Sequence, residues 1–163
     1  MAVMKIMKLG EDDVLRKKAH PVKIIDRRTQ ALLKDMAETM YDADGVGLAA
    51  PQVGILRRIV VIDVGDGLIE LINPEIIASE GAEVAPEGCL SVPGRRGTVE
   101  RPTKVTVRAL DGKGREIEFT AEGLFARAVC HELDHLDGVV YVDKMIEDVT
   151  EQMMNEAGDG EDE

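Results

Sequence analysis

The pentapeptide His131-Glu132-Leu133-Asp134-His135 decides how the rest of the chain is interpreted. Its two histidines are four residues apart, which places them on one face of a helix, one turn above each other. Residues 121–136 predict such a helix, because they contain no proline and only one glycine, at the start, and Gly138 is a typical helix stop. Both imidazoles can then reach one metal ion, with Glu132 placed to act as a base on water there. The alternative is an amphipathic helix in which the two histidines are only packed.

A catalytic site of this kind uses three protein ligands and leaves one position for water. Glu147 and Glu151 are poor candidates for the third ligand, because they lie in a charged segment close behind the helix. Cys130 is adjacent to the first histidine, hence about 100° around the helix, and points away from the site. Cys89 remains, in a glycine-rich loop, and a thiolate is a good ligand for zinc, iron or nickel. Cys89 is therefore the favoured third ligand, and a small buried hydrophobic residue is the alternative.

Composition restricts the class of protein. At 163 residues the chain is expected to form one domain, with an aliphatic core because it has two Phe, two Tyr and no Trp. The net charge of −12 and the lack of stacking aromatics argue against nucleic-acid binding. No stretch has the length of a membrane span or a signal peptide, and two cysteines make no disulfide framework. The third histidine, His20, has no ligand spacing around it and is expected at the surface. The expected compartment is the cytoplasm.

The order of elements predicts an α+β fold, with antiparallel or mixed strands packed around a central metal-binding helix. The spacing of apolar residues indicates a helix over 26–41, with Asp26 as its N-cap. It also indicates strands over 55–63 and 68–77 and a hairpin over 104–120. Residues 45–52 and 81–97 are expected to be loops. Asp143 is expected to begin a short C-terminal helix. Residues 1–150 are then a single catalytic domain, and residues 151–163 an acidic, disordered tail.

Three motifs together resemble the signature motifs of the peptide deformylase family, in order and at similar separations. They are Gly45-Val46-Gly47-Leu48-Ala49-Ala50-Pro51-Gln52, Glu87-Gly88-Cys89-Leu90-Ser91 and His131-Glu132-Leu133-Asp134-His135. The resemblance covers the chain except its acidic tail. One departure is Cys130, where the family commonly has Gln; we expect it to change local packing and not the chemistry.

The resemblance implies a metal-dependent hydrolase that removes the formyl group from the N-terminal formylmethionine of newly made proteins. It implies that Cys89, His131 and His135 hold one divalent ion, often Fe(II), with Zn, Ni or Co able to substitute. Glu132 is the implied general base. The implied partners are N-formylmethionyl nascent peptides, and also the ribosome near its exit tunnel; no membrane and no sequence-specific nucleic-acid binding are implied.

Hydrolysis of a formamide develops an oxyanion, which needs hydrogen-bond donors. The side-chain amide of Gln52 and the backbone N–H of Leu90 are the candidates, although Gln52 alone would be taken for a surface amide. Helix geometry places Leu124 and Ala128 on the metal-facing side, where they are candidates for a methionine pocket or for ordinary core. The remaining candidate substrate-binding residues are Val46, Gly47, Leu48 and Gly88.

Two other classes of protein compete with this interpretation. A small zinc metallopeptidase of the HExxH type would share the helix residues but would have no use for Cys89 or Gln52. A binding module with a closed structural zinc site needs four ligands, and each candidate for the fourth is poorly placed. It also leaves Glu132 without a role.

Overall fold

The computed structural model describes residues 2–152 and shows an α+β fold. The helical elements are η1 (Asp13–Arg16), α1 (Arg27–Asp42), η2 (Ala50–Val53), α2 (Gly123–Leu136) and η3 (Tyr141–Asp143). The strands are β1 (Gly47–Ala49), β2 (Ile59–Ile62), β3 (Ile69–Glu80), β4 (Glu83–Cys89), β5 (Val92–Arg101), β6 (Lys104–Leu110), β7 (Glu116–Glu122) and β8 (Glu147–Asp148). Within the described residues the strands form an antiparallel sheet of order β1-β2-β3-β6-β7 and a smaller antiparallel sheet of order β4-β5-β8. Among residues 2–152, no helix is long and apolar enough to cross a bilayer.

Helix α1 forms where the sequence predicts it and covers one face of the larger sheet. The Asp26 side chain accepts a hydrogen bond from the backbone N–H of Thr29, which is the N-cap interaction expected for that residue. The apolar stripe of α1 packs against Ile59 and Val61 of β2. Val60 and Ile62 of the same strand contribute to a separate core cluster on the α2 side. The alternation of side chains along β2 therefore separates two hydrophobic layers, one under each helix.

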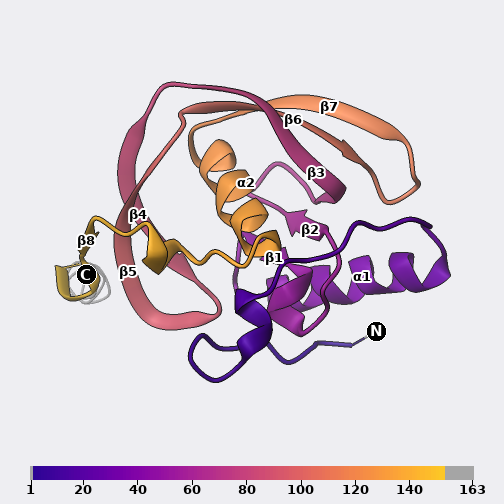
Figure 1. Cartoon of the computed structure of the whole chain (residues 1–163), viewed down its shortest axis with the longest axis horizontal. Coiled ribbons are helices and arrows are strands. Elements are labelled where there is room, and N and C mark those ends of the chain that lie inside the picture. The colour runs from indigo at the N-terminus through magenta and orange to yellow at the C-terminus, as the bar shows by residue number, and fades with distance from the viewer. Residues whose placement is uncertain (1, 153–163) are drawn as a thin grey trace.

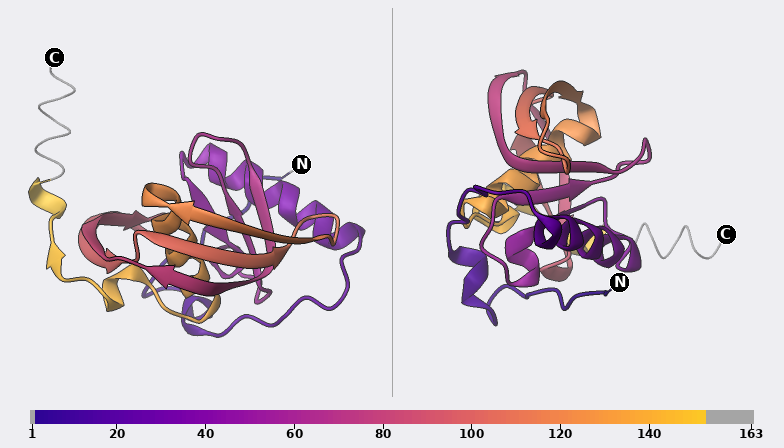
Figure 2. Two further views of the ribbon diagram at one scale, coloured as in Figure 1. Left: turned by 90° about the horizontal axis from the view of Figure 1, so that it is seen from above. Right: turned by 90° about the vertical axis from the view of Figure 1, so that its right-hand side faces the viewer.

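Helix α2 occupies the centre of the molecule, between the larger sheet and the β4–β5 hairpin (Figure 1). Its residues Ala126, Val129 and Leu133 pack in one cluster with Val105 and Val107 of β6. Figure 2 shows the long strands β6 and β7 extending past this helix. The buried position of α2 fixes both candidate metal-ligand histidines of the predicted motif against the sheet layers.

The prediction that residues 81–97 form a loop is wrong. This segment contributes β4 and the first half of β5. The two strands pair in an antiparallel hairpin, in which Glu83 lies opposite Arg101 at one end and Cys89 lies opposite Val92 at the other. Its glycines and prolines indicated a loop, but pairing between the strands and with β8 overrides that local preference. The hairpin carries Cys89 at its tip, so the candidate ligand is on a paired strand.

Residues 45–52 also differ from the predicted loop, because they form the edge strand β1 and the short helix η2. The C-terminal prediction is wrong in position as well. Asp143 ends η3, residues 147–148 pair with Gly97 and Thr98 as β8, and helical residues begin only at Thr150. The predicted acidic tail lies outside the described residues from residue 153 onward.

Candidate active site

Cys89 from β4 and two histidines from α2 converge on one point. The ligand atoms of Cys89, His131 and His135 lie within 4.8 Å of one another, and the Cys89 Sγ is 3.3 Å from the His135 Nε2. The two imidazole rings are 5.0 Å apart, one turn of helix apart as the sequence predicts. Cys130, by contrast, is buried in the core cluster between α2 and the larger sheet, away from this point. His20 is exposed and forms a β-bridge with Arg57.

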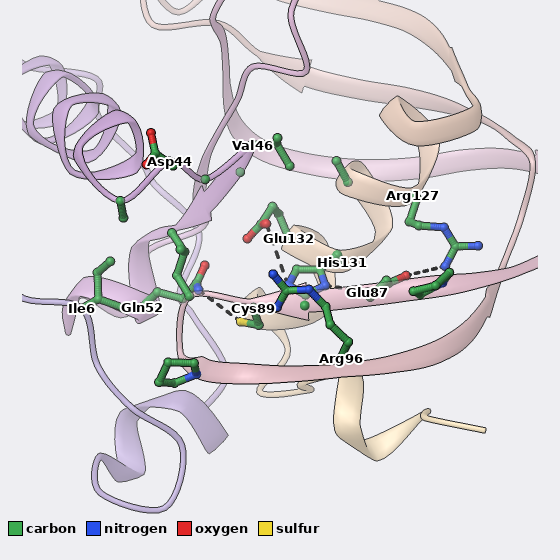
Figure 3. Close-up of a pocket in the computed structure, with 18 of the residues that line it drawn as sticks. Ile6, Asp44, Val46, Gln52, Glu87, Cys89, Arg96, Arg127, His131 and Glu132 are labelled. Carbon is green, nitrogen blue, oxygen red and sulfur yellow. Dashed lines mark hydrogen bonds and ion pairs between the residues drawn. The ribbon is translucent and has the colours of Figure 1, made fainter. Parts of the chain in front are cut away.

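Glu132 lies beside the histidines and is almost fully buried. Its Oε2 is 4.0 Å from the His131 Nε2 (Figure 3), while its Oε1 has no hydrogen-bond partner within residues 2–152. The carboxylate fits against β1 only because residue 47 is glycine: a Cβ there would lie 2.6 Å from the Glu132 Oε2. Burial raises the pKa of Glu132 to about 7. A carboxylate with a pKa near neutral is suited to accepting and returning a proton.

A buried ion-pair network holds His131 in place. Glu87 Oε1 is 2.9 Å from the His131 Nδ1, and the same carboxylate binds Arg101 at 2.9 Å and Arg127 at 2.7 Å. Arg101 also binds Asp134 of α2 at 2.6 Å. A ligating histidine that gives its Nδ1–H to a carboxylate keeps its Nε2 lone pair free for a metal ion. Figure 3 shows Glu87 between Arg127 and His131.

Replacing Glu87 by Gln should weaken metal binding by about 10- to 100-fold, as removal of such an outer partner usually does. Burial would raise the pKa of Glu87, but hydrogen bonds from His131 and Arg101 lower it from 4.5 to about 2. Its contribution to stability is therefore present above pH 4.5 and is lost as the pH falls toward 2. Competition with a chelator measures the affinity of Glu87→Gln for the metal ion. The control is Glu83→Gln, an exposed residue on the same strand. An unchanged affinity in Glu87→Gln would contradict this role.

Gln52 is fixed so that its amide nitrogen faces the sulfur of Cys89. Its Oε1 accepts the backbone N–H of Ala49 at 2.9 Å, and its Nε2 lies 3.5 Å from the Cys89 Sγ and 3.2 Å from the Ser91 Oγ. Gln52 is almost completely buried, so it is not a surface amide. Leu90 follows the sulfur directly and, like Gln52, lines the same cavity.

The three motifs open onto a cavity of about 550 Å³. Of the residues expected to bind substrate, Val46, Gly47, Gly88, Leu124 and Ala128 line it. Leu48, also expected to bind substrate, is not among them: its side chain is completely buried in the cluster under α1. Successive residues of a strand point to opposite faces, so Gly47 faces Glu132 while Leu48 faces α1.

The charges around the cluster suit a cation. Burial lowers the pKa of His131, but the neighbouring Glu132, Cys89 and Glu87 together raise it well above its ordinary value. Burial and then the adjacent His131 lower the pKa of His135 well below its ordinary value. One thiol sulfur and two imidazole nitrogens, with negative groups around them, form a donor set suited to zinc, iron, nickel or cobalt.

Several contributing residues are not evident from the sequence alone. Arg127 donates to Glu87 and to backbone carbonyls of both β4 and β5 (Glu83 and Val99). Ser91 is buried, and its N–H lies 3.4 Å from the Cys89 Sγ. Position within the second motif was the available signal for Ser91, and no local signal predicts the buried ion pairs of Arg127.

An α+β fold that brings a thiol, two imidazoles of an HExxH helix and a buried carboxylate together defines the class of mononuclear metal-dependent hydrolases. Within that class, the model of the polypeptide deformylase family matches residues 3–151. The chain belongs to the polypeptide deformylase family.

Similar proteins span nearly the whole chain. Peptide deformylase 1 of Clostridium acetobutylicum is 61% identical over 147 residues, which is 90% of this chain and 97% of that protein. The peptide deformylase of Caldanaerobacter subterraneus is 62% identical over 146 residues, which is 90% of this chain and 91% of that protein. The crystal structure of peptide deformylase from Thermotoga maritima has a TM-score of 0.87 at 44% identity and covers 89% of this chain and 99% of its own.

Proposed function

We propose that this protein is a peptide deformylase, a metal-dependent hydrolase that removes the N-formyl group from N-terminal formylmethionine of newly made proteins and releases formate. The observation that carries the proposal is the convergence of Cys89, His131 and His135 within 4.8 Å, on a chain of the deformylase family. The buried Glu132 beside them supplies the base that amide hydrolysis requires.

The side chains of Cys89, His131 and His135 would hold the ion, and Glu87 would fix the orientation of His131. When bound, the ion supplies Lewis-acid chemistry, which lowers the pKa of water and polarises the formyl oxygen. Glu132 takes the proton from the attacking water and then delivers a proton to the leaving amine. Glu132 is buried and its Oε1 makes no hydrogen bond to any of residues 2–152, which leaves the carboxylate available for this transfer.

The developing negative charge on the formyl oxygen is met by two donors, the Gln52 amide and the Leu90 backbone N–H. The Ala49 N–H holds the Gln52 oxygen, which leaves the amide nitrogen on the side of the metal ligands. Donors that are oriented before the reaction lose no energy to reorganisation during it. We assign Val46, Leu124 and Ala128 to the apolar pocket for the methionine side chain, since all three line the cavity.

The direct test is formate release from formyl-Met-Ala beside acetyl-Met-Ala. The formyl carbon carries only a hydrogen, whereas the acetyl carbon carries a methyl group that must fit beside Glu132 and the three candidate metal ligands. The extra methyl group of the acetyl substrate should therefore lower kcat/KM by at least roughly 10- to 200-fold. Equal hydrolysis of both substrates, or cleavage of internal peptide bonds without formate release, would contradict the proposal.

We propose Fe(II) as the native ion, with Zn, Ni or Co able to replace it, because all suit a donor set of one sulfur and two nitrogens. Ferrous iron beside a half-buried thiolate is sensitive to oxygen, and Cys89 can itself be oxidised. Protein purified without oxygen should contain about one iron per chain and be more active than aerobic material. Metal analysis that finds no iron, with activity independent of oxygen, would remove this assignment.

We place the protein in the cytoplasm, where a ferrous thiolate site and two free cysteines are kept reduced. Its partners are then formylated chains as they leave the ribosome. The strongly acidic composition makes direct contact with ribosomal RNA unfavourable, so transient contact through the nascent chain is the form of association we propose.

A further inference from the structure

We infer that Lys8 is a positioning residue for the sulfur of Cys89, acting through the peptide group between Leu90 and Ser91. The inference rests on the proposed function in one respect, the assignment of Cys89 as a metal ligand. It concerns the N-terminal strap, defined here as residues Met7–Leu9, which lies outside the three motifs and has no role in the mechanism above.

The N-terminal strap joins the two walls of the site. The Met7 N–H donates to the backbone carbonyl of Gln52 at 2.7 Å, and the Leu9 N–H donates to the carbonyl of Ser91 at 2.9 Å. Between them, the Lys8 backbone N–H donates to Asp12 at 2.8 Å, which fixes the direction of the strap. The strap thus binds both the residue that carries the candidate oxyanion donor and the turn that carries the candidate ligand.

The Lys8 side chain reaches the same turn. Its Nζ donates to the backbone carbonyl of Leu90 at 3.3 Å. That carbonyl belongs to the peptide group whose N–H, on Ser91, lies 3.4 Å from the Cys89 Sγ. A continuous path therefore runs from the Lys8 ammonium through one peptide group to the sulfur.

Hydrogen bonds in series polarise one another, and a charged donor is stronger than a neutral one. The Lys8 ammonium draws electron density toward the Leu90 oxygen and makes the Ser91 N–H a better donor to the sulfur. A thiolate that accepts a stronger hydrogen bond holds its charge more tightly and is kept in one orientation. Lys8 thus fixes the Cys89 sulfur from outside the set of ligands.

Lys8 also lines the cavity, which offers a competing explanation, direct contact with the peptide substrate. The two roles predict different kinetics. A substrate contact changes KM and leaves the spectrum of the bound ion unchanged, whereas a positioning role changes the spectrum and the retention of the ion.

The test uses the full chain loaded with Co(II), whose absorption includes a sulfur-to-cobalt charge-transfer band when a thiolate is bound. Lys8→Met removes the charge and keeps the length of the side chain, Lys8→Arg restores a charged donor, and the exposed Lys5→Met is the matched control from the same segment. We expect the band of Lys8→Met to move to longer wavelength and its cobalt to dissociate into a chelator about tenfold faster. We expect the kcat of Lys8→Met to fall with its KM unchanged. Lys8→Arg should recover most of the parent's band position and cobalt retention, and Lys5→Met should match the parent protein.

A band and a dissociation rate unchanged in Lys8→Met would overturn the inference, as would a rise in KM alone. Cys89→Ser separates this failure from failure of the proposed function. If the parent protein shows a charge-transfer band that Cys89→Ser lacks, the ligand assignment stands whatever Lys8 does. If the parent lacks the band, the ligand assignment is wrong and this inference fails with it.

Discussion

Replacing Glu132 by Gln should lower kcat for formate release by about 10²- to 10⁴-fold, the range that general acid–base catalysis contributes. The amide has nearly the same shape but cannot accept a proton from water, and Oε1 of Glu132 has no other partner within the described part of the chain. The histidine ligands are unchanged, so the metal content should remain near that of the parent protein. Parallel measurement of kcat and bound metal checks both expectations.

A suitable control for Glu132→Gln is Glu116→Gln, an exposed carboxylate on β7. It alters the net charge by the same amount and should leave kcat unchanged. If Glu132→Gln retained more than a third of the parent activity with full metal content, another group would have to move the proton. Among the described residues that line the cavity, Glu87 is the other buried carboxylate, and both of its oxygens are already bound to arginine or histidine.

Replacing Cys89 by Ala should remove the metal ion and reduce formate release to background. Only two imidazoles would remain, and the loss in affinity should exceed the roughly 10- to 100-fold typical of an outer-shell partner. Metal analysis after gel filtration and the formate assay measure the two effects. Cys130→Ala is the matched control, because that thiol is buried in the core on the sheet side of α2 and should leave metal content unchanged.

The same variant separates the proposed function from the competing metallopeptidase. A peptidase of the HExxH type would use His131, His135 and Glu132 but not the sulfur. A Cys89→Ala protein that kept its metal and cleaved internal peptide bonds would therefore favour the peptidase. The Cys89 Sγ lies 3.3 Å from the His135 Nε2, which supports the expectation that Cys89→Ala loses both its metal ion and its formate release.

Features that depend on local spacing could be predicted from the sequence. Helix α2 follows from an uninterrupted apolar pattern and ends before Gly138, whose φ of +76° suits glycine. The N-cap Asp26 follows from residue type, and the β6–β7 hairpin from alternation around a turn. In each case the deciding interactions lie within a few residues.

Features that depend on distant partners could not be predicted in this way. The β4–β5 hairpin contains Pro86, Pro93 and several glycines, and it is a sheet only because its two strands pair with each other and with β8. Arg127, which binds Glu87, is 40 positions away in sequence, so no local pattern marks it as buried. Leu48 was expected to bind substrate from a loop, but on strand β1 successive side chains alternate, and that of Leu48 packs under α1.

The ion pairs of Glu87 have a consequence for how the protein acquires its metal. They connect the hairpin to the central helix through Arg127 and His131 using protein groups alone. We therefore expect the scaffold of the site to persist without a bound ion, unlike small zinc domains that fold only around their metal. A stripped protein should keep its fold and accept a new ion without refolding, so the metal found in it reflects supply in the cell as much as selection by the site.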